Sequence, residues 1–319
     1  MSADDLLPYA QETAAMSESV LDSKPPDVFE RATKFRWVIC GLLFYATTLN
    51  YMDRSVLNVL QPDLKAQFHF TDAQYGYINS AFSAAYTIGF LIMGTIIDRL
   101  GTRMGYAISL IVWSASGAAT SLVNSTFGLG VARCCLALGE AGNFPAAIKT
   151  VAEWFPRRQR ATATGIFNSG SNIGAILAFW LVPIAVSRIS WRAAFLITPI
   201  FAVVWIVIWL LIYRHPEKHW GVNSAELAHI NSDGVALIPR KVRWSQILPH
   251  SQTWAIMLGK FFTDPVWWFY LFWSGAFIHD RFGGDIKHLG PPLIVIYFFS
   301  SFGSIFGGWS AVASRRMGG

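Results

Sequence analysis

The sequence predicts an all-α membrane protein that crosses the bilayer several times. Hydrophobic residues make up 53% of its 319 residues and charged residues only 14%, whereas charged residues are about 25% of a typical soluble domain. The mean hydropathy is +0.40, and eight apolar segments are long enough to span a membrane. This composition excludes an ordinary soluble globular domain.

The chain begins with an acidic tail, which eight apolar segments follow. Residues 1–34 are polar and contain no apolar core followed by a small-residue cleavage site, so we predict a disordered cytosolic tail and not a signal peptide. Each apolar segment after it is predicted to be a transmembrane helix. These segments lie at 36–60, 75–97, 104–123, 126–149, 162–186, 192–213, 253–278 and 291–313.

The longest connection between apolar segments predicts two bundles. Residues 35–213 form a six-helix bundle in this interpretation, 214–250 a cytosolic inter-bundle loop, and 251–319 the start of a second bundle. With the N-terminus inside, 17 of the 25 Lys and Arg residues fall in inner segments and five in outer loops. The positive-inside rule therefore predicts a multi-pass protein of the cytoplasmic membrane with a cytosolic N-terminus. The basic residues form no continuous stripe, which excludes a nucleic-acid partner.

A charged pair lies inside the first predicted span. Asp53 and Arg54 are flanked by apolar residues, and a charge at the centre of a membrane helix costs roughly 2.5 to 3.5 kcal/mol on insertion scales. Such groups normally face a watery cavity and handle ions or substrate. At about 100° per residue, Tyr51 and Arg54 share a face with Asn50, whereas Asp53 points toward an adjoining helix.

Two further spans carry polar stripes. Arg133 and Glu140 are seven residues apart, so they lie on one side of their helix about 10 Å apart. In the fifth span, Asn168, Ser171 and Asn172 share an arc, and glycines lie on the opposite side. Small polar residues of this kind either bind a ligand or form interhelical hydrogen bonds.

The loop between the second and third spans carries a recognisable motif. Its defining residues are Gly94, Asp98, Arg99, Gly101 and Arg103. This pattern resembles the signature loop of the major facilitator superfamily, a loop that acts in conformational change. We expect the glycines to permit a tight turn, Asp98 to accept hydrogen bonds at a neighbouring helix end, and the arginines to reach acidic groups or lipid phosphate.

Motifs in the other spans narrow the resemblance to one branch. They are Asn-Tyr-Met-Asp-Arg at 50–54, the segments 138–145 and 165–175, and the seventh-span residues Lys260, Phe261, 263–265 and 267–273. Together they are similar to the anion:cation symporter family, and among its members to bacterial hexuronate transporters of galacturonate and glucuronate. Lys260 and Asp264 are four residues apart and are expected to form an intrahelical pair or, for Lys260, to snorkel inward.

The resemblance implies the major facilitator fold, which has twelve spans in two six-helix halves. This chain supplies eight predicted spans. We therefore expect a complete N-terminal six-helix bundle followed by the first two helices of the C-terminal bundle, in a chain that is C-terminally truncated.

The resemblance also assigns roles to residues. It implies that Arg54 binds the substrate carboxylate and that Asp53, Arg133 and Glu140 serve proton coupling. The other substrate-binding positions are Tyr51, Tyr86, Asn168, Ser171, Asn172, Trp267 and Tyr270. Alternatives are a structural ion pair from Arg54 to Asp53 or Glu140, and simple packing for Tyr86.

The expected function is proton-coupled symport of a hexuronate or related sugar-acid anion. We expect no enzymatic activity, cofactor or metal, because neither a metal-ligand cluster nor a phosphate-binding glycine loop is present in the sequence. The expected partners are the anion, a proton and the lipid bilayer, and the protein is expected to be a monomer. Two alternatives remain: a non-transporting membrane binding or regulatory protein, and a symporter of another organic anion such as an aldonate, an aromatic acid or a dicarboxylate.

Overall fold

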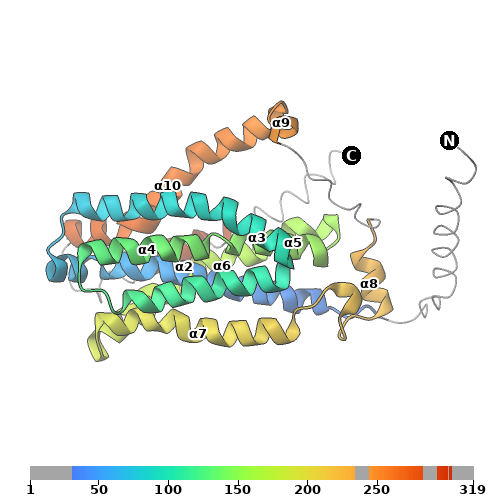
Figure 1. Ribbon diagram of the computed structural model, residues 1–319, viewed down its shortest axis with the longest axis horizontal. Coiled ribbons are helices and arrows are strands. Elements are labelled where there is room, and N and C mark those ends of the chain that lie inside the picture. Colours follow the sequence, from blue (N-terminus) through green and yellow to red (C-terminus); the bar gives the residue numbers. More distant parts are fainter. Residues whose placement is uncertain (1–30, 234–243, 283–292, 301, 304–319) are drawn as a thin grey trace, which may run out of the picture.

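The computed structural model describes residues 31–233, 244–282, 293–300 and 302–303, and these residues form helices and turns without a strand (Figure 1). The helices are α2 (Phe35–Phe68), α3 (Asp72–Thr120), α4 (Thr126–Glu140), α5 (Asn143–Trp154), α6 (Arg157–Arg188), α7 (Trp191–Ile212), α8 (Ser224–Ile230), α9 (Trp244–Ile247) and α10 (Ser251–Phe282). Residues 293–300 are also helical. Most of the predicted tail, part of the inter-bundle loop and much of the eighth predicted span lie outside the described residues.

The predicted spans correspond to helices, with two differences in how the helices are divided. The second and third spans are joined into α3 across a kink at Gly101, where φ is 78° and ψ is 163°. Positive φ is a conformation that glycine adopts without steric cost, so the motif glycine sets the turn. The fourth span is divided into α4 and α5 by a turn at Ala141 and Gly142.

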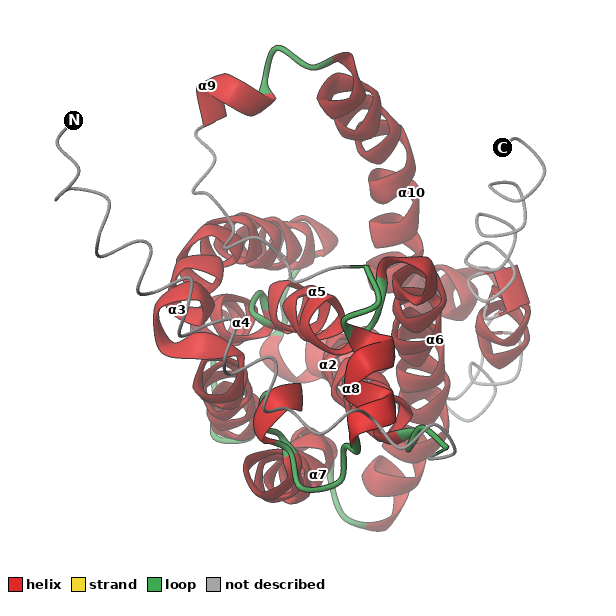
Figure 2. Cartoon of the chain, turned by 90° about the vertical axis from the view of Figure 1, so that its right-hand side faces the viewer, coloured by secondary structure: helices red, strands yellow, loops and turns green. Residues whose placement is uncertain are grey.

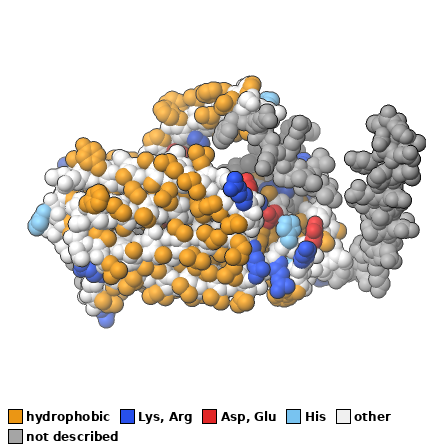
Figure 3. Space-filling model, in the orientation of Figure 1, with side chains coloured by type: hydrophobic (Ala, Val, Ile, Leu, Met, Phe, Trp, Pro, Cys, Tyr) orange, Lys and Arg blue, Asp and Glu red, His pale blue; other side chains and the backbone are white. Residues whose placement is uncertain are grey.

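Length and apolarity single out three helices as able to cross a membrane, among the residues described. They are Asp72–Thr120, Arg157–Arg188 and Trp191–Ile212. The helix α2 is long enough as well, but it carries Asp53 and Arg54 among its buried residues. Hydrophobic side chains cover the long side of the bundle in Figure 3, while Lys and Arg gather at the end that holds α8. This distribution fits a bundle surrounded by lipid.

Helix α2 lies at the centre of the bundle, with α6 packed closely along it (Figure 2). A Cβ atom added at Gly174 would lie 2.2 Å from the carbonyl oxygen of Thr48, and one at Gly170 would lie 2.6 Å from that of Phe44. Glycine at these two positions therefore allows the backbones to touch. The two residues lie on the packing face that the sequence predicts for the fifth span.

Helix α10 approaches the bundle with its second half and leans away with its first (Figures 1 and 2). Leu271 and Phe272 are buried, and their carbonyl oxygens accept hydrogen bonds from Asn58 Nδ2 at 2.9 Å and the Tyr75 hydroxyl at 3.0 Å. Most side chains between residues 251 and 263 are exposed. A cavity opens between this part of α10 and the bundle.

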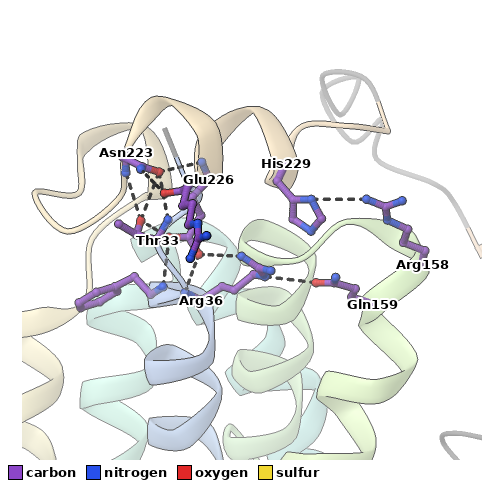
Figure 4. Close-up of polar contacts among 9 residues, drawn as sticks. Thr33, Arg36, Arg158, Gln159, Asn223, Glu226 and His229 are labelled. Carbon is purple, nitrogen blue, oxygen red and sulfur yellow. Dashed lines mark hydrogen bonds and ion pairs between the residues drawn. The ribbon is translucent and has the colours of Figure 1, made fainter. Parts of the chain in front are cut away.

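The short helix α8 caps one end of the bundle (Figure 4). Its Glu226 is fully buried and accepts hydrogen bonds from the backbone nitrogens of Phe35 and Arg36 at 3.1 and 3.2 Å. The same carboxylate binds Arg36 Nη1 at 2.9 Å and the Thr33 hydroxyl at 2.5 Å. Glu226 thus supplies acceptors for orphan N–H groups at the start of α2 from 190 residues away.

Candidate functional site

A cavity of about 770 Å³ lies between the bundle and α10. Its size falls in the range of about 300–1,000 Å³ that is usual for small-molecule sites. Predicted substrate-binding residues lie on three of its walls: Tyr51 and Arg54 on α2, Tyr86 on α3, and Asn168, Ser171 and Asn172 on α6. Helix α10 contributes Trp267 and Trp268, together with Lys260 and Asp264.

Arg54 forms a buried ion pair at the wall of this cavity. Its Nε donates to Glu140 Oε2 at 2.7 Å, and the two side chains are 1% and 0% exposed. The terminal nitrogens Nη1 and Nη2 make no hydrogen bond of normal geometry within the described part of the chain. One edge of the guanidinium group is therefore held by Glu140, and the fork that could receive a carboxylate has the Tyr86 side chain as its polar neighbour.

Aromatic rings surround the guanidinium group. The Arg54 Cζ atom lies 4.5 Å from the ring centroid of Tyr86, 4.8 Å from that of Tyr51 and 5.2 Å from that of Trp268. These distances are within the range of cation–π attraction. The rings come from three helices, so the charge is held in place at the point where α2, α3 and α10 meet.

Asp53 points away from the cavity, as its position in the helix predicts. Its Oδ1 accepts a hydrogen bond from the Thr198 hydroxyl on α7, whereas Oδ2 has no hydrogen-bond partner among the described residues. Arg133 lies nearby, with Nη1 3.5 Å from the backbone oxygen of Asp53. Its guanidinium carbon is 4.7 Å from the Phe82 ring centroid.

These four buried charged residues inside the bundle, Asp53, Arg54, Arg133 and Glu140, form a cluster with balanced formal charge and incomplete hydrogen bonding. Arg54 and Arg133 are 1% exposed, Asp53 is 4% exposed and Glu140 is fully buried. Atoms without a partner in the described ranges are Asp53 Oδ2, Glu140 Oε1, two nitrogens of Arg54 and two of Arg133. Since buried polar atoms in proteins are nearly always paired, this concentration distinguishes the cluster from a purely structural network.

Comparison with known proteins decides the family. Residues 43–319 match the sequence profile of the Major Facilitator Superfamily. The chain belongs to this superfamily. It is 37% identical to the galacturonate transporter of Dickeya chrysanthemi over 286 residues. This alignment covers 88% of this chain and 83% of that protein. It is 34% identical over 283 residues to the hexuronate transporter of Escherichia coli K12, covering 86% of this chain and 64% of that protein.

Solved structures agree with the major facilitator fold. A bacterial homologue of the human lysosomal transporter Spinster, in an inward-facing and occupied conformation, has a TM-score of 0.61 at 21% identity and covers 82% of this chain and 59% of its own. A double-tryptophan mutant of XylE has a TM-score of 0.63 at 12% identity, and the match covers 84% of this chain and 67% of the XylE chain. The predicted fold and family resemblance are confirmed, and a superfamily of transporters places the chain outside the enzymes.

The superfamily's signature loop makes several contacts at the α8 end. Lys149 Nζ on α5 donates to Asp98 Oδ1 at 2.9 Å and to the Ile97 carbonyl at 3.2 Å. Arg103 donates to the carbonyl of Leu210 near the end of α7. Arg99 is exposed, and a Cβ added at Gly94 would meet no atom within 4 Å. The loop thus joins α3 to α5 and α7.

One of the predicted substrate-binding residues lies outside the cavity. Tyr270 is 51% exposed and does not line the cavity. It is two residues beyond Trp268, about 200° around the helix, so its side chain cannot share the cavity face. Trp268 takes the place next to Arg54 instead.

Sequence reasoning missed several residues that contact the site. Asn143 lines the cavity and accepts from the Tyr106 hydroxyl at 2.5 Å, and Thr47 lies 3.5 Å from its Nδ2. Asn143 follows Glu140 by three residues, which is a helical spacing that could have indicated it. Thr198 is a hydroxyl in an otherwise apolar helix, but nothing in the sequence indicates that it meets Asp53.

Proposed function

We propose that this chain belongs to a proton-coupled symporter that carries a hexuronate or a related sugar-acid anion across the cytoplasmic membrane. The observation that carries the proposal is the buried Arg54, whose guanidinium group lies at the cavity wall between Glu140 and Tyr86. Guanidinium stays charged when buried and matches a carboxylate with two parallel hydrogen bonds. Arg54 is accordingly the carboxylate anchor.

The remainder of the cavity suits a polyhydroxylated ligand. Asn168, Ser171 and Asn172 offer amide and hydroxyl groups along one wall, and Asn172 Oδ1 has no partner among the described residues. Aromatic residues supply the apolar surface that sugar rings stack on. Similar proteins are named for transport of galacturonate, hexuronate and D-galactonate, and others at 28% identity as probable galactarate/D-glucarate transporters, which supports a sugar acid as substrate.

Proton coupling follows from the charge balance of the buried cluster. With Asp53 and Glu140 ionised, their two charges offset those of Arg54 and Arg133. Protonation of Glu140 weakens its hold on Arg54 and leaves one positive charge in excess, which the substrate carboxylate then neutralises. Proton and anion therefore favour each other's binding. Asp53 is the second candidate carrier, since one of its oxygens lacks a partner in the described ranges.

Charge placement supports the orientation. The α8 end of the bundle carries Arg31, Arg36, Arg157 and Arg158, which contact residues of the segment 223–233, and Lys34 and Lys218 lie in the adjoining segments. Positive residues of short loops remain on the cytosolic side. We therefore place the N-terminus and α8 in the cytosol, with the protein passing through the membrane several times.

The test is uptake of labelled galacturonate by proteoliposomes with an imposed inward proton gradient. Arg54→Ala is expected to reduce uptake to background. Glu140→Gln is expected to abolish accumulation driven by the gradient while exchange of internal for external substrate persists, because exchange needs no net proton movement. Lys65→Gln, which alters an exposed ion pair with Asp72, serves as control. Unchanged uptake in both site variants would exclude the mechanism, and binding without flux would favour a non-transporting binding protein.

A further inference from the structure

The charged groups of the cavity are divided between two walls. Arg54 lies on α2, whereas Lys260 and Asp264 lie on α10. Asp264 is the only acidic side chain among the described residues that line the cavity. It is partly exposed, at 41% of its side chain, and accepts a hydrogen bond from Lys260 Nζ at 3.0 Å. The function proposed above does not use this pair.

Helical spacing places the pair relative to Arg54. Lys260, Asp264 and Trp268 follow one another at intervals of four residues and so share one face of α10. The Trp268 ring lies 5.2 Å from the Arg54 guanidinium carbon. With a rise of about 1.5 Å per residue, Asp264 lies roughly 6 Å along the helix from Trp268, and Lys260 roughly 12 Å.

A sugar acid held at Arg54 by one carboxylate therefore directs its other end toward Asp264. An aldehyde hydrate or a hydroxyl at that end can donate a hydrogen bond to the Asp264 carboxylate. A second carboxylate has no proton to donate and meets a like charge, which opposes binding. Lys260 weakens this repulsion, because its ammonium group is paired with Asp264 and offsets part of the negative charge.

We propose that Asp264 selects sugar acids with one carboxylate over those with two. This inference rests on the proposed function, because it assumes that Arg54 anchors the first carboxylate. Replacement of Asp264 by a neutral residue removes the like charge and frees Lys260 as a second cation. The same cavity would then hold a positive charge for each end of a dicarboxylate.

The experiment measures how well galactarate competes with labelled galacturonate for uptake, relative to competition by galactonate. Galactarate and galactonate differ only at one terminal carbon, so their ratio reports the charge preference at the far end of the site. Asp264→Asn is expected to shift this ratio toward galactarate by about tenfold or more. Lys260→Gln is expected to shift it away from galactarate, and the double variant is expected to lie between the two single variants.

A matched control is present in the chain. Asp72 is another exposed aspartate paired with a lysine, with Lys65 Nζ 2.5 Å from its Oδ1, and it does not line the cavity. Asp72→Asn should leave the ratio unchanged. The proposal is overturned if Asp264→Asn moves the ratio by less than twofold, or if Lys260→Gln moves it in the same direction as Asp264→Asn.

Failure of this inference is distinguishable from failure of the proposed function. If the unaltered protein takes up none of these acids, the proposed function is wrong. If the unaltered protein takes up galacturonate but the variants show the same ratio of galactarate to galactonate competition, only the role of Asp264 is wrong. Competition for binding to purified Asp264→Asn protein supplies the ratio if that variant no longer transports, since replacement of a partly exposed side chain is expected to leave the fold intact.

Discussion

The molecule contains two buried arginine–glutamate pairs that differ in how completely they are hydrogen-bonded. Arg36 and Glu226 bind at 2.9 Å at the α8 end, and both carboxylate oxygens also accept hydrogen bonds from the start of α2. Arg54 and Glu140 bind at 2.7 Å inside the bundle, where Glu140 Oε1 and two Arg54 nitrogens lack a partner in the described ranges. The first pair caps the start of α2, whereas the second has polar atoms to spare, which the proposed function assigns to a ligand and a proton.

Replacement of each arginine by lysine tests this difference most strongly. Arg54→Lys is expected to reduce galacturonate uptake by about 100-fold or more, because an ammonium group cannot bind Glu140 and offer a planar fork at the same time. Arg36→Lys should retain most uptake per folded molecule, because Arg36 does not line the cavity. Initial uptake rates normalised to the protein in the membrane give the comparison. Equal losses in the two variants would mean that the pairs do not differ in role.

Replacement of Glu226, the glutamate at the α8 end, should lower the stability of the folded protein. Glu226→Ala removes the acceptor of Arg36 Nη1 and of the first N–H groups of α2, and breaking a buried pair in this way costs about 3–5 kcal/mol. Thermal unfolding of the purified protein should show a lower midpoint. The control is Glu217→Ala, at an exposed position between α7 and α8, which should change the midpoint of thermal unfolding little. An unaltered midpoint for Glu226→Ala would show that α8 does not hold the bundle end.

The contact between α2 and α6 should tolerate little added volume. Gly174→Ala places a methyl group where the Thr48 oxygen lies 2.2 Å away, and overpacking of this kind typically costs about 1–3 kcal/mol. Gly41→Ala on α2 is the matched control, because no atom lies within 4 Å of its added Cβ. The unfolding midpoints of the two variants should therefore differ. If they coincide, α2 and α6 can separate without cost.

A smaller effect concerns pH at the α8 end. Burial, with help from Arg36 and Arg158, lowers the pKa of His229 below its usual 6.5, against the opposing charges of Glu226 and Asp233. The unfolded chain therefore binds the proton more readily, so the free energy of unfolding should decrease as the pH falls below about 6.5. Thermal midpoints between pH 7.5 and 5.5 measure this decrease, which should be smaller in His229→Gln. If the unfolding midpoint of His229→Gln changes with pH as steeply as that of the unaltered protein, other groups cause the pH dependence.

The sequence predicted the parts of the fold that depend on local patterns. Apolar length located the spans, and a spacing of 100° per residue placed Tyr51 and Arg54 on the cavity side and Asp53 on the opposite side. Contacts between distant segments could not be predicted in this way. Thr198 meets Asp53 from 145 residues away, and the cap by Glu226 depends on how α8 folds back. Such partners are fixed by tertiary packing, which leaves no periodic signal.

The closeness of α2 and α6 has a consequence for how access to the cavity changes. Because no side-chain atom separates the Thr48 oxygen from Gly174, the two helices cannot slide past each other without first parting. The wall that carries Arg54, Asn168 and Asn172 is thus a rigid block. The fully buried side chains of α10 begin only at Leu271, so we expect α10 to be the wall that moves when access to the cavity changes. An inhibitor bound between Trp268 and the α2–α6 block is then expected to hold the cavity open.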